Sequence, residues 1–291
     1  MKPAPFGYLA PTSRDEALDA LHRYGAEAKV LAGGQSLVPL LAMRLARPAV
    51  LIDLNRARDL AYIRPWRGGL AIGAMTRQRA VESDPRVAAR LPLLRAAVHW
   101  IGHPQIRARG TIGGSLAHAD PAAELPAAAL VHDARFVLAG RRGERVVSAR
   151  EFFTGYLSTA LEPTELLTEI RFPAMPAGAG WAFNEIARRH GDFALVGVAG
   201  LLVGDADGRC TEARLAFVGV SHGPVRVTDA EQALLGRRVD PAAAAEVAAI
   251  VRASLDPDGD IHASGRYRRH VAGEMVSRAL LVAAARMRAP A

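Results

Sequence analysis

The chain has 291 residues, half of them hydrophobic, which is enough for a sizeable core divided among more than one domain. Its 37 Lys and Arg residues outnumber 29 Asp and Glu residues, giving a net charge of +8. These basic residues are scattered among acidic ones and only 5% of residues are aromatic, which argues against a nucleic-acid-binding protein. The single cysteine, Cys210, excludes an internal disulfide framework and an iron–sulfur cluster or zinc ribbon built by this chain alone.

The N-terminal segment MKPAPFGYLAPTS has proline and polar residues where a secretory signal would carry its apolar core. No hydrophobic run approaches the length of a membrane span. We therefore expect a cytoplasmic protein without a membrane span. No group of His, Asp and Glu has convincing ligand spacing, so no metal site is expected either.

Residues 1–55 predict an N-terminal subdomain that contains a compact βαβ unit. Ser13 and Glu16 predict the start of a helix over 13–24, which Gly25 closes. A strand over 29–32, a helix over 37–45 with Ser36 as its N-cap, and a strand over 49–53 follow.

Residues 56–175 predict a middle α/β subdomain of shorter elements. The predicted hairpin pairs 60–63 with 70–72, and helices follow over 76–83 and 86–98. Residues 101–110 contain two structure breakers and are predicted to form a loop. The remaining predicted elements are a helix over 126–131 and strands over 135–138, 145–147 and 166–172.

The Pro- and Gly-rich stretch 173–180 predicts a linker, so residues 176–291 are expected to form a C-terminal domain. Its predicted elements are strands over 181–187, 194–203 and 214–220 and helices over 241–255 and 266–288. The expected fold class is α+β, ending in a three-stranded antiparallel sheet covered by helices.

Two glycine pairs carry the clearest chemical signal. Lys29, Val30 and Leu31 lead into Ala32-Gly33-Gly34-Gln35-Ser36, and a similar pairing with hydroxyl residues recurs at Thr111-Ile112-Gly113-Gly114-Ser115. Glycines let backbone amides approach a phosphate, and a helix N-terminus adds partial positive charge. Neither stretch fits a Rossmann fingerprint or a P-loop. We expect the amides of both segments to hold the pyrophosphate of a dinucleotide between subdomains.

Five stretches together indicate a family: KVLAGGQSL, IGHPQIRARGTIGGS, ADPAAELP, TELLTEIRFP and RRHGDFA, in that order. This combination resembles the FAD-binding medium subunit of the molybdenum hydroxylases, and within that family most resembles the medium subunits of aerobic carbon monoxide dehydrogenases. The resemblance covers nearly the whole chain. It implies FAD, bound between the first two subdomains as a PCMH-like unit, with the third domain closing over the flavin.

The resemblance also implies which residues contact FAD. Ala32 to Ser36, extended to Leu37, and Thr111 to Ser115 would line the pyrophosphate, with Lys29, Val30 and Leu31 beside the nucleotide. Glu124 falls where related flavoproteins place an aspartate that accepts from the ribityl hydroxyls. Asp120 either does similar work or caps the helix after Pro121.

Further residues are implied near the flavin ring. Leu166 and Leu167 match apolar residues close to the ring, although core packing is the commoner role of such strand residues. Phe193 matches an aromatic residue, commonly tyrosine in the family, that covers one face of the isoalloxazine. Ile101 and His103 lie in the matching loop, and we expect His103 and His118 to be structural, hydrogen-bonded histidines.

The resemblance implies an electron-transfer flavoprotein subunit that has no catalytic residue of its own. Its partners would be an iron–sulfur small subunit and a molybdenum-cofactor large subunit, assembled as a dimer of heterotrimers. Electrons would pass from the molybdenum site through two iron–sulfur clusters to this FAD and on to an external acceptor. The alternatives are the same role in an aldehyde, purine or N-heterocycle dehydrogenase, a self-sufficient FAD oxidase, and a nucleotide-binding subunit that never cycles redox.

Overall fold

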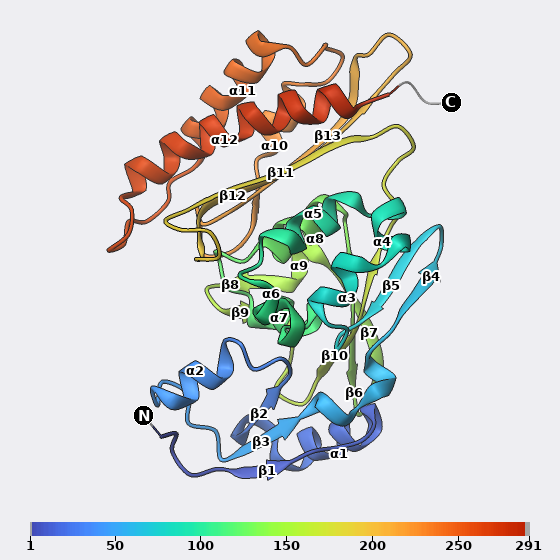
Figure 1. The fold of residues 1–291 in the computed structure, drawn as a ribbon, viewed down its shortest axis with the longest axis vertical. Helices are drawn as coiled ribbons and strands as arrows, with labels where there is room; N and C mark the ends of the chain where they lie inside the picture. The colour runs from blue at the N-terminus through green and yellow to red at the C-terminus, as the bar shows by residue number, and fades with distance from the viewer. Residues whose placement is uncertain (1, 289–291) are drawn as a thin grey trace.

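The computed structural model describes residues 2–288 and arranges three main sheets along the long axis of the molecule (Figure 1). The N-terminal sheet lies at one end, the middle sheet follows, and the C-terminal sheet with its long helices lies at the other end. The mixed α and β architecture confirms the expected fold class.

The N-terminal sheet is entirely parallel, in the order β1 (Gly7–Leu9), β3 (Val50–Asp53), β2 (Ala28–Leu31). The βαβ prediction is confirmed, whereas strand β1 was not predicted. Helix α1 (Arg14–Tyr24) begins where the Ser13 side chain accepts from the Glu16 amide, and its buried Ala17 and Leu21 pack on this sheet.

Helix α2 (Leu37–Ala42) begins at the predicted residue but differs from the prediction in its cap and in its end. The backbone of Ser36 is already helical, whereas a capping residue needs an extended backbone, so its hydroxyl caps nothing. The helix also ends before residue 45, because Arg44 adopts a left-handed conformation with φ of 59°.

The middle sheet is antiparallel, in the order β4-β5-β10-β6-β7. Its strands are β4 (Ile63–Trp66), β5 (Gly69–Gly73), β6 (Arg135–Gly140), β7 (Gly143–Ser148) and β10 (Leu166–Phe172). The accompanying elements are α3 (Gln78–Ser83), α4 (Pro85–Arg90), α5 (Pro92–Trp100), α6 (Pro104–Arg109), α7 (Ile112–His118), α8 (Glu124–Val131), α9 (Ala149–Phe152) and the hairpin β8 (Phe153–Gly155) with β9 (Ser158–Thr159).

Three predictions for this subdomain are wrong in detail, two of them because of proline. Pro92 splits the helix predicted over 86–98 into α4 and α5, and Pro104 opens α6 within the predicted loop. A proline at the first helical position loses no intrahelical bond, so it begins a helix as readily as it breaks one. The first hairpin strand lies at 63–66, three residues beyond its prediction.

The C-terminal sheet has four antiparallel strands in sequence order, not three: β11 (Gly180–Ala187), β12 (Ala194–Gly204), β13 (Cys210–Val218) and β14 (Val225–Arg226). The added strand is only two residues long and has no periodic signal. Helices α11 (Pro241–Ser254) and α12 (Gly265–Arg286) cover one face, α10 (Thr228–Gln232) packs on β13, and the other face meets α5 and α8 (Figure 1).

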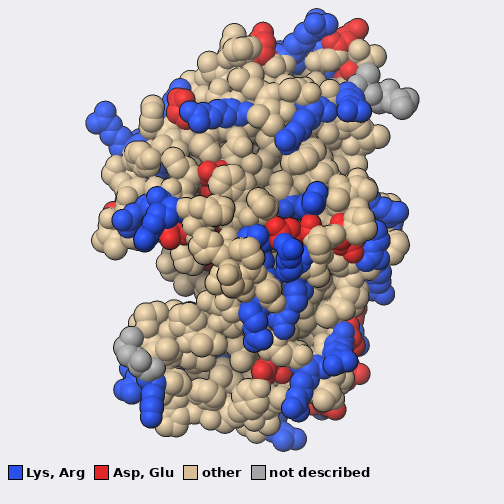
Figure 2. All heavy atoms as spheres, viewed as in Figure 1, with Lys and Arg blue, Asp and Glu red and all other residues tan. Residues whose placement is uncertain are grey.

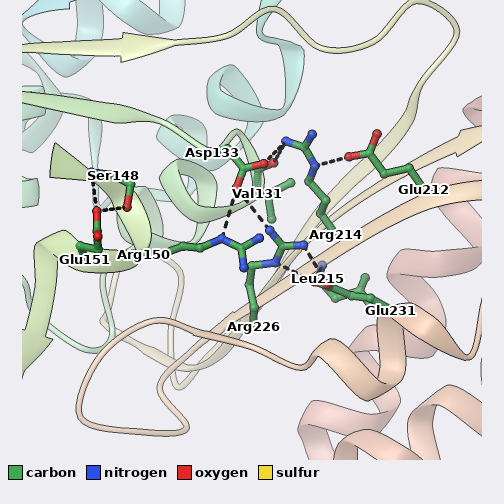
Figure 3. Close-up of polar contacts among 10 residues, drawn as sticks. All are labelled: Val131, Asp133, Ser148, Arg150, Glu151, Glu212, Arg214, Leu215, Arg226 and Glu231. Carbon is green, nitrogen blue, oxygen red and sulfur yellow. Dashed lines mark hydrogen bonds and ion pairs between the residues drawn. The ribbon is translucent and has the colours of Figure 1, made fainter. Parts of the chain in front are cut away.

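An arginine cluster around Asp133 joins the middle subdomain to the C-terminal sheet (Figure 3). The Asp133 carboxylate lies 2.8 Å from Nη1 of Arg214 on β13 and 3.3 Å from Nη1 of Arg226 on β14. Arg150 of α9 approaches it to 3.5 Å. One carboxylate thus links three chain segments at the seam.

Among residues 2–288, no helix is both long enough and apolar enough to cross a membrane. Over the same residues, no three or more His, Cys, Asp or Glu side chains are grouped so that they could hold a metal ion.

Candidate functional site

The first glycine segment joins β2 to α2 and leaves its backbone donors free. Gly34 has φ of 78°, a left-handed conformation that favours glycine. The Gln35 side chain donates to the Gly33 carbonyl at 3.1 Å. Within the described part of the chain, the amides of Gly33, Gly34, Gln35 and Ser36 have no hydrogen-bond acceptor. Four consecutive free amides at a helix start form a site for an anion.

The second glycine segment begins at Thr111, the N-cap of α7, and four of its five amides are already used. The Ile112 and Gly113 amides donate to the Thr76 and Ala74 carbonyls at 3.0 and 2.8 Å. The Gly114 amide donates to the Thr111 hydroxyl at 3.0 Å, and the Ser115 amide to the Thr111 carbonyl at 3.2 Å. Neighbouring carbonyls and the helix cap therefore take four of the five amides, and only the Thr111 amide has no hydrogen-bond acceptor among residues 2–288.

The two segments nevertheless meet, as expected, and their glycines allow this approach. A Cβ on Gly33 would lie 2.5 Å from the Arg109 carbonyl oxygen and 2.7 Å from the Gly110 Cα. A Cβ on Gly114 would lie 3.0 Å from the Cβ of Ala32. Residues far apart in sequence are thus in direct contact, and side chains larger than hydrogen would separate them.

A cavity of about 340 Å³ opens at this junction, and Figure 2 shows the surface hollowed between the lobe that carries α2 and the middle of the molecule. Five predicted residues line it, Leu31 to Gln35. Five others were not predicted: Val38, Pro39, Asp53, Asn55 and Arg109.

The polar wall of this cavity is a connected network. Asn55 donates to the Ala32 carbonyl at 3.0 Å and accepts from Arg77 at 2.6 Å. Arg77 also donates to the Arg109 carbonyl. Asp53 and Asn55 lie at the carboxyl end of parallel strand β3, the edge where such sheets bind ligands. Polar residues at the end of the predicted strand 49–53 and directly after it were the signal that could have identified them.

A buried arginine shapes the loop that contains Ile101 and His103. Arg107 is 4% exposed and donates to the Ile101 and Gly102 carbonyls, at 3.0 Å each. Its Nε donates to Glu82 at 3.0 Å. Burial raises the pKa of Glu82, but hydrogen bonds from His99, Arg107 and Arg79 outweigh this, so the pKa ends below its ordinary value. The Arg107–Glu82 pair therefore holds this loop in place.

The loop between β11 and β12 packs on His103. Gly191 has φ of 86°, and a Cβ there would lie 2.7 Å from the His103 ring. Phe193, two residues on, is 68% exposed, which leaves its ring free to cover a ligand. The structure thus brings the predicted Phe193 and Ile101 segments together.

Leu166 and Leu167 are core residues of β10, each 4% exposed. Leu166 packs in the N-terminal core and Leu167 in the middle core. Their packing matches the core role that was left open for them.

The carboxyl groups after α7 have distinct environments. Asp120 accepts from the Ala122 amide at 2.9 Å and so shapes a turn, while α8 starts without any side-chain cap. Burial lowers the pKa of His118 at the end of α7, while the nearby charge of Asp120 acts in the opposite direction. Glu124, the first residue of α8, is 7% exposed, and burial raises its pKa to about 7.

Comparison with protein families identifies the family to which the chain belongs. A model described as the FAD binding domain in molybdopterin dehydrogenase matches residues 4–175, and one described as the CO dehydrogenase flavoprotein C-terminal domain matches residues 181–283. The chain belongs to the FAD-binding medium subunits of molybdenum hydroxylases. FAD is its cofactor, and it is a subunit of an oxidoreductase, so these predictions are confirmed.

Individual relatives of this medium subunit match over its full length. The 6-hydroxypseudooxynicotine dehydrogenase complex subunit alpha of Paenarthrobacter nicotinovorans is 43% identical over 99% of this chain and 97% of its own. The caffeine dehydrogenase subunit beta of Pseudomonas sp. is 41% identical over the same shares. A solved carbon monoxide dehydrogenase from Hydrogenophaga pseudoflava matches with a TM-score of 0.96 and 42% identity, covering 99% of this chain and 100% of that one.

Proposed function

We propose that this subunit binds FAD where the glycine segments meet and relays electrons from an iron–sulfur partner subunit to an external acceptor. The four free amides beside the cavity are the observation that carries the proposal, because a diphosphate needs such a row of donors. When bound, the flavin supplies one- and two-electron exchange, which these side chains do not provide.

Different residues of the chain would contact different parts of the cofactor. The amides of Gly33 to Ser36 bind the pyrophosphate, and the second segment contributes the contact surface around Gly114. Leu31, Asp53 and Asn55, which line the cavity, face the nucleotide in this proposal, and Lys29 and Val30 lie beside it. The remaining contacts are assigned to Leu37, Thr111 to Ser115, Asp120, Glu124, Ile101 and Phe193, with Leu166 and Leu167 as packing behind them.

The proposed assembly is a dimer of heterotrimers with an iron–sulfur small subunit and a molybdenum-cofactor large subunit, in the cytoplasm. Within the chain we propose domains over 1–55, 56–175 and 176–291, which coincide with the three main sheets. For the large partner subunit, carbon monoxide is our first candidate substrate, since the solved carbon monoxide dehydrogenase shares the fold of this chain at a TM-score of 0.96. An N-heterocyclic compound is the second, since the caffeine dehydrogenase subunit is 41% identical.

An absorption experiment on the purified chain and on the complex with its partners tests this proposal. We expect flavin bands that bleach when dithionite is added to either sample. In the complex, the partner's substrate should bleach them too, whereas the chain without partners should oxidise neither carbon monoxide nor N-heterocycles. Turnover by the chain alone would favour a self-sufficient oxidase. Bands that no reductant bleaches would favour a subunit without redox function.

A further inference from the structure

Asn55 is held in one orientation by hydrogen bonds on both sides of its side-chain amide. Its Nδ2 donates to the Asp53 carboxylate at 2.5 Å and to the Ala32 carbonyl at 3.0 Å, and its Oδ1 accepts from Nη2 of Arg77 at 2.6 Å. The Tyr8 hydroxyl donates to the other oxygen of Asp53 at 2.6 Å and so fixes the carboxylate. A flipped amide would set its nitrogen against the guanidinium and its oxygen against two acceptors, so these partners allow one orientation.

The peptide unit between Ala32 and Gly33 is the group that this orientation controls. Its C=O and N–H point in opposite directions, because the described part of the chain has no cis peptide bond. Asn55 takes the carbonyl, so the Gly33 N–H is left on the side away from Asn55, where it has no acceptor among residues 2–288. The Gln35 side chain holds the next peptide unit in the same way, by donating to the Gly33 carbonyl at 3.1 Å.

Arg77 joins the first of these peptide units to the second glycine segment. Its Nη1 donates to the carbonyl of Arg109, the backbone oxygen against which Gly33 packs. The backbone of Arg77 is placed by an antiparallel bridge to Thr111, the first residue of the second segment. The contacts close a ring, which we call the Arg77 ring, made of Arg77, Asn55, the Ala32–Gly33 peptide unit and the Arg109 carbonyl.

We propose that Arg77 is a positioning residue for FAD: acting through Asn55, it holds the first glycine segment so that its free amides are presented to the pyrophosphate. This role rests on the proposed function, which assigns those amides to the pyrophosphate. The shape of the guanidinium matters here and not its charge alone, because its two terminal nitrogens hold different partners. A lysine would keep the positive charge but supply one nitrogen in place of two.

The first test needs no FAD and follows backbone amides by NMR in the full chain labelled with ¹⁵N-glycine. The resonance of an amide responds to a hydrogen bond on the carbonyl of its own peptide unit. Arg77→Lys and Asn55→Leu should therefore move the Gly33 resonance further than the Gly34 resonance. Gln35→Leu should move Gly34 further than Gly33, because Gln35 holds the carbonyl of the next peptide unit.

Arg90→Lys is the matched control for this measurement. Like Arg77, Arg90 donates to backbone carbonyls, those of Gly68 and Gly69 at 3.3 Å each, but it does not line the cavity. The control should leave the glycine resonances of the first segment in place. A Gly33 resonance that stays at its wild-type position in Arg77→Lys, or that moves as far in the control, would overturn the positioning role.

The second test titrates FAD onto the deflavinated complex. Arg77→Lys and Asn55→Leu should each raise the FAD dissociation constant by about 3- to 10-fold, the usual effect of one hydrogen bond. The double variant should bind no more weakly than the weaker single variant, because both changes act on one peptide unit. Arg90→Lys should change the dissociation constant by less than about twofold.

The ³¹P NMR spectrum of the bound cofactor separates positioning from a general loss of stability. In Arg77→Lys the two pyrophosphate resonances should move toward those of free FAD, whereas a variant that only destabilises the fold would leave them in place. Wild-type affinity with unmoved resonances in Arg77→Lys would overturn the proposal. If the wild-type complex binds no FAD, the proposed function fails, while the glycine resonances of the FAD-free chain still decide whether Arg77 sets the geometry of the first segment.

Discussion

Replacing Gly33 with alanine should weaken FAD binding, because Gly33 lies where the two glycine segments touch. The added Cβ would meet the Arg109 carbonyl oxygen at 2.5 Å and the Gly110 Cα at 2.7 Å, and both are backbone atoms. An ordinary contact needs about 3.4 Å or more, so the segments must separate by roughly 1 Å. Arg109 lines the cavity, so this movement displaces one wall from the free amides on the other.

The size of the effect follows from packing energetics. Forcing an additional carbon into a close-packed contact costs about 1–3 kcal/mol. If FAD binding requires the original separation, the dissociation constant should rise by about 5- to 150-fold, at 1.4 kcal/mol for each factor of ten. The melting temperature of the FAD-free chain should fall as well, because the same contact joins the N-terminal and middle subdomains.

FAD titration followed by flavin fluorescence, at a temperature well below the unfolding transition, measures this change. Gly223→Ala is the matched control, because a Cβ at Gly223 has no neighbouring atom within 4 Å and its backbone is not left-handed. Wild-type FAD affinity in Gly33→Ala, or an equal loss in Gly223→Ala, would refute the reasoning that the contact between the segments shapes the site.

Three further predictions concern the surroundings of the site. Asp133→Asn keeps a residue that tolerates the left-handed backbone but removes the carboxylate shared by three arginines (Figure 3). Urea unfolding should show that the free energy of unfolding falls by about 1 kcal/mol and that this loss disappears at high salt. A loss that salt does not change would contradict an ionic role. Glu82→Gln should lower the free energy of unfolding by about 2–4 kcal/mol at pH 7. Because folding lowers the pKa of Glu82, this difference from wild type should shrink as the pH falls below the ordinary pKa of a glutamate, as unfolding measured over a series of acid pH values would show. Phe193→Ala should reduce FAD affinity by about 2- to 10-fold while leaving the melting temperature unchanged, because the ring is 68% exposed, and Phe193→Tyr should retain affinity; a large fall in melting temperature would instead indicate a packing role.

Local patterns in the sequence were sufficient for the family, the cofactor and most elements. The glycine pairs, the βαβ periodicity around residues 29–53 and the strand 166–172 depend on neighbouring residues, and the structure has them close to where they were predicted. Errors occurred where one residue type has two local meanings. Pro92 and Pro104 open helices, Ser36 caps nothing, and the two-residue strand β14 is too short for a period.

By itself the sequence determined the family and its FAD cofactor, because ordered motifs carry that information along the chain, and it predicted that the two distant glycine segments meet. Only the tertiary structure decided which backbone amides of the two segments remain free for a ligand. The carbonyls of Ala74 and Thr76 take the amides of Gly113 and Ile112, whereas four consecutive amides of the first segment have no acceptor among residues 2–288. In the same way, buried Glu124 has no ion pair with an arginine among residues 2–288, since the partner of a buried charge depends on which strands and helices pack together.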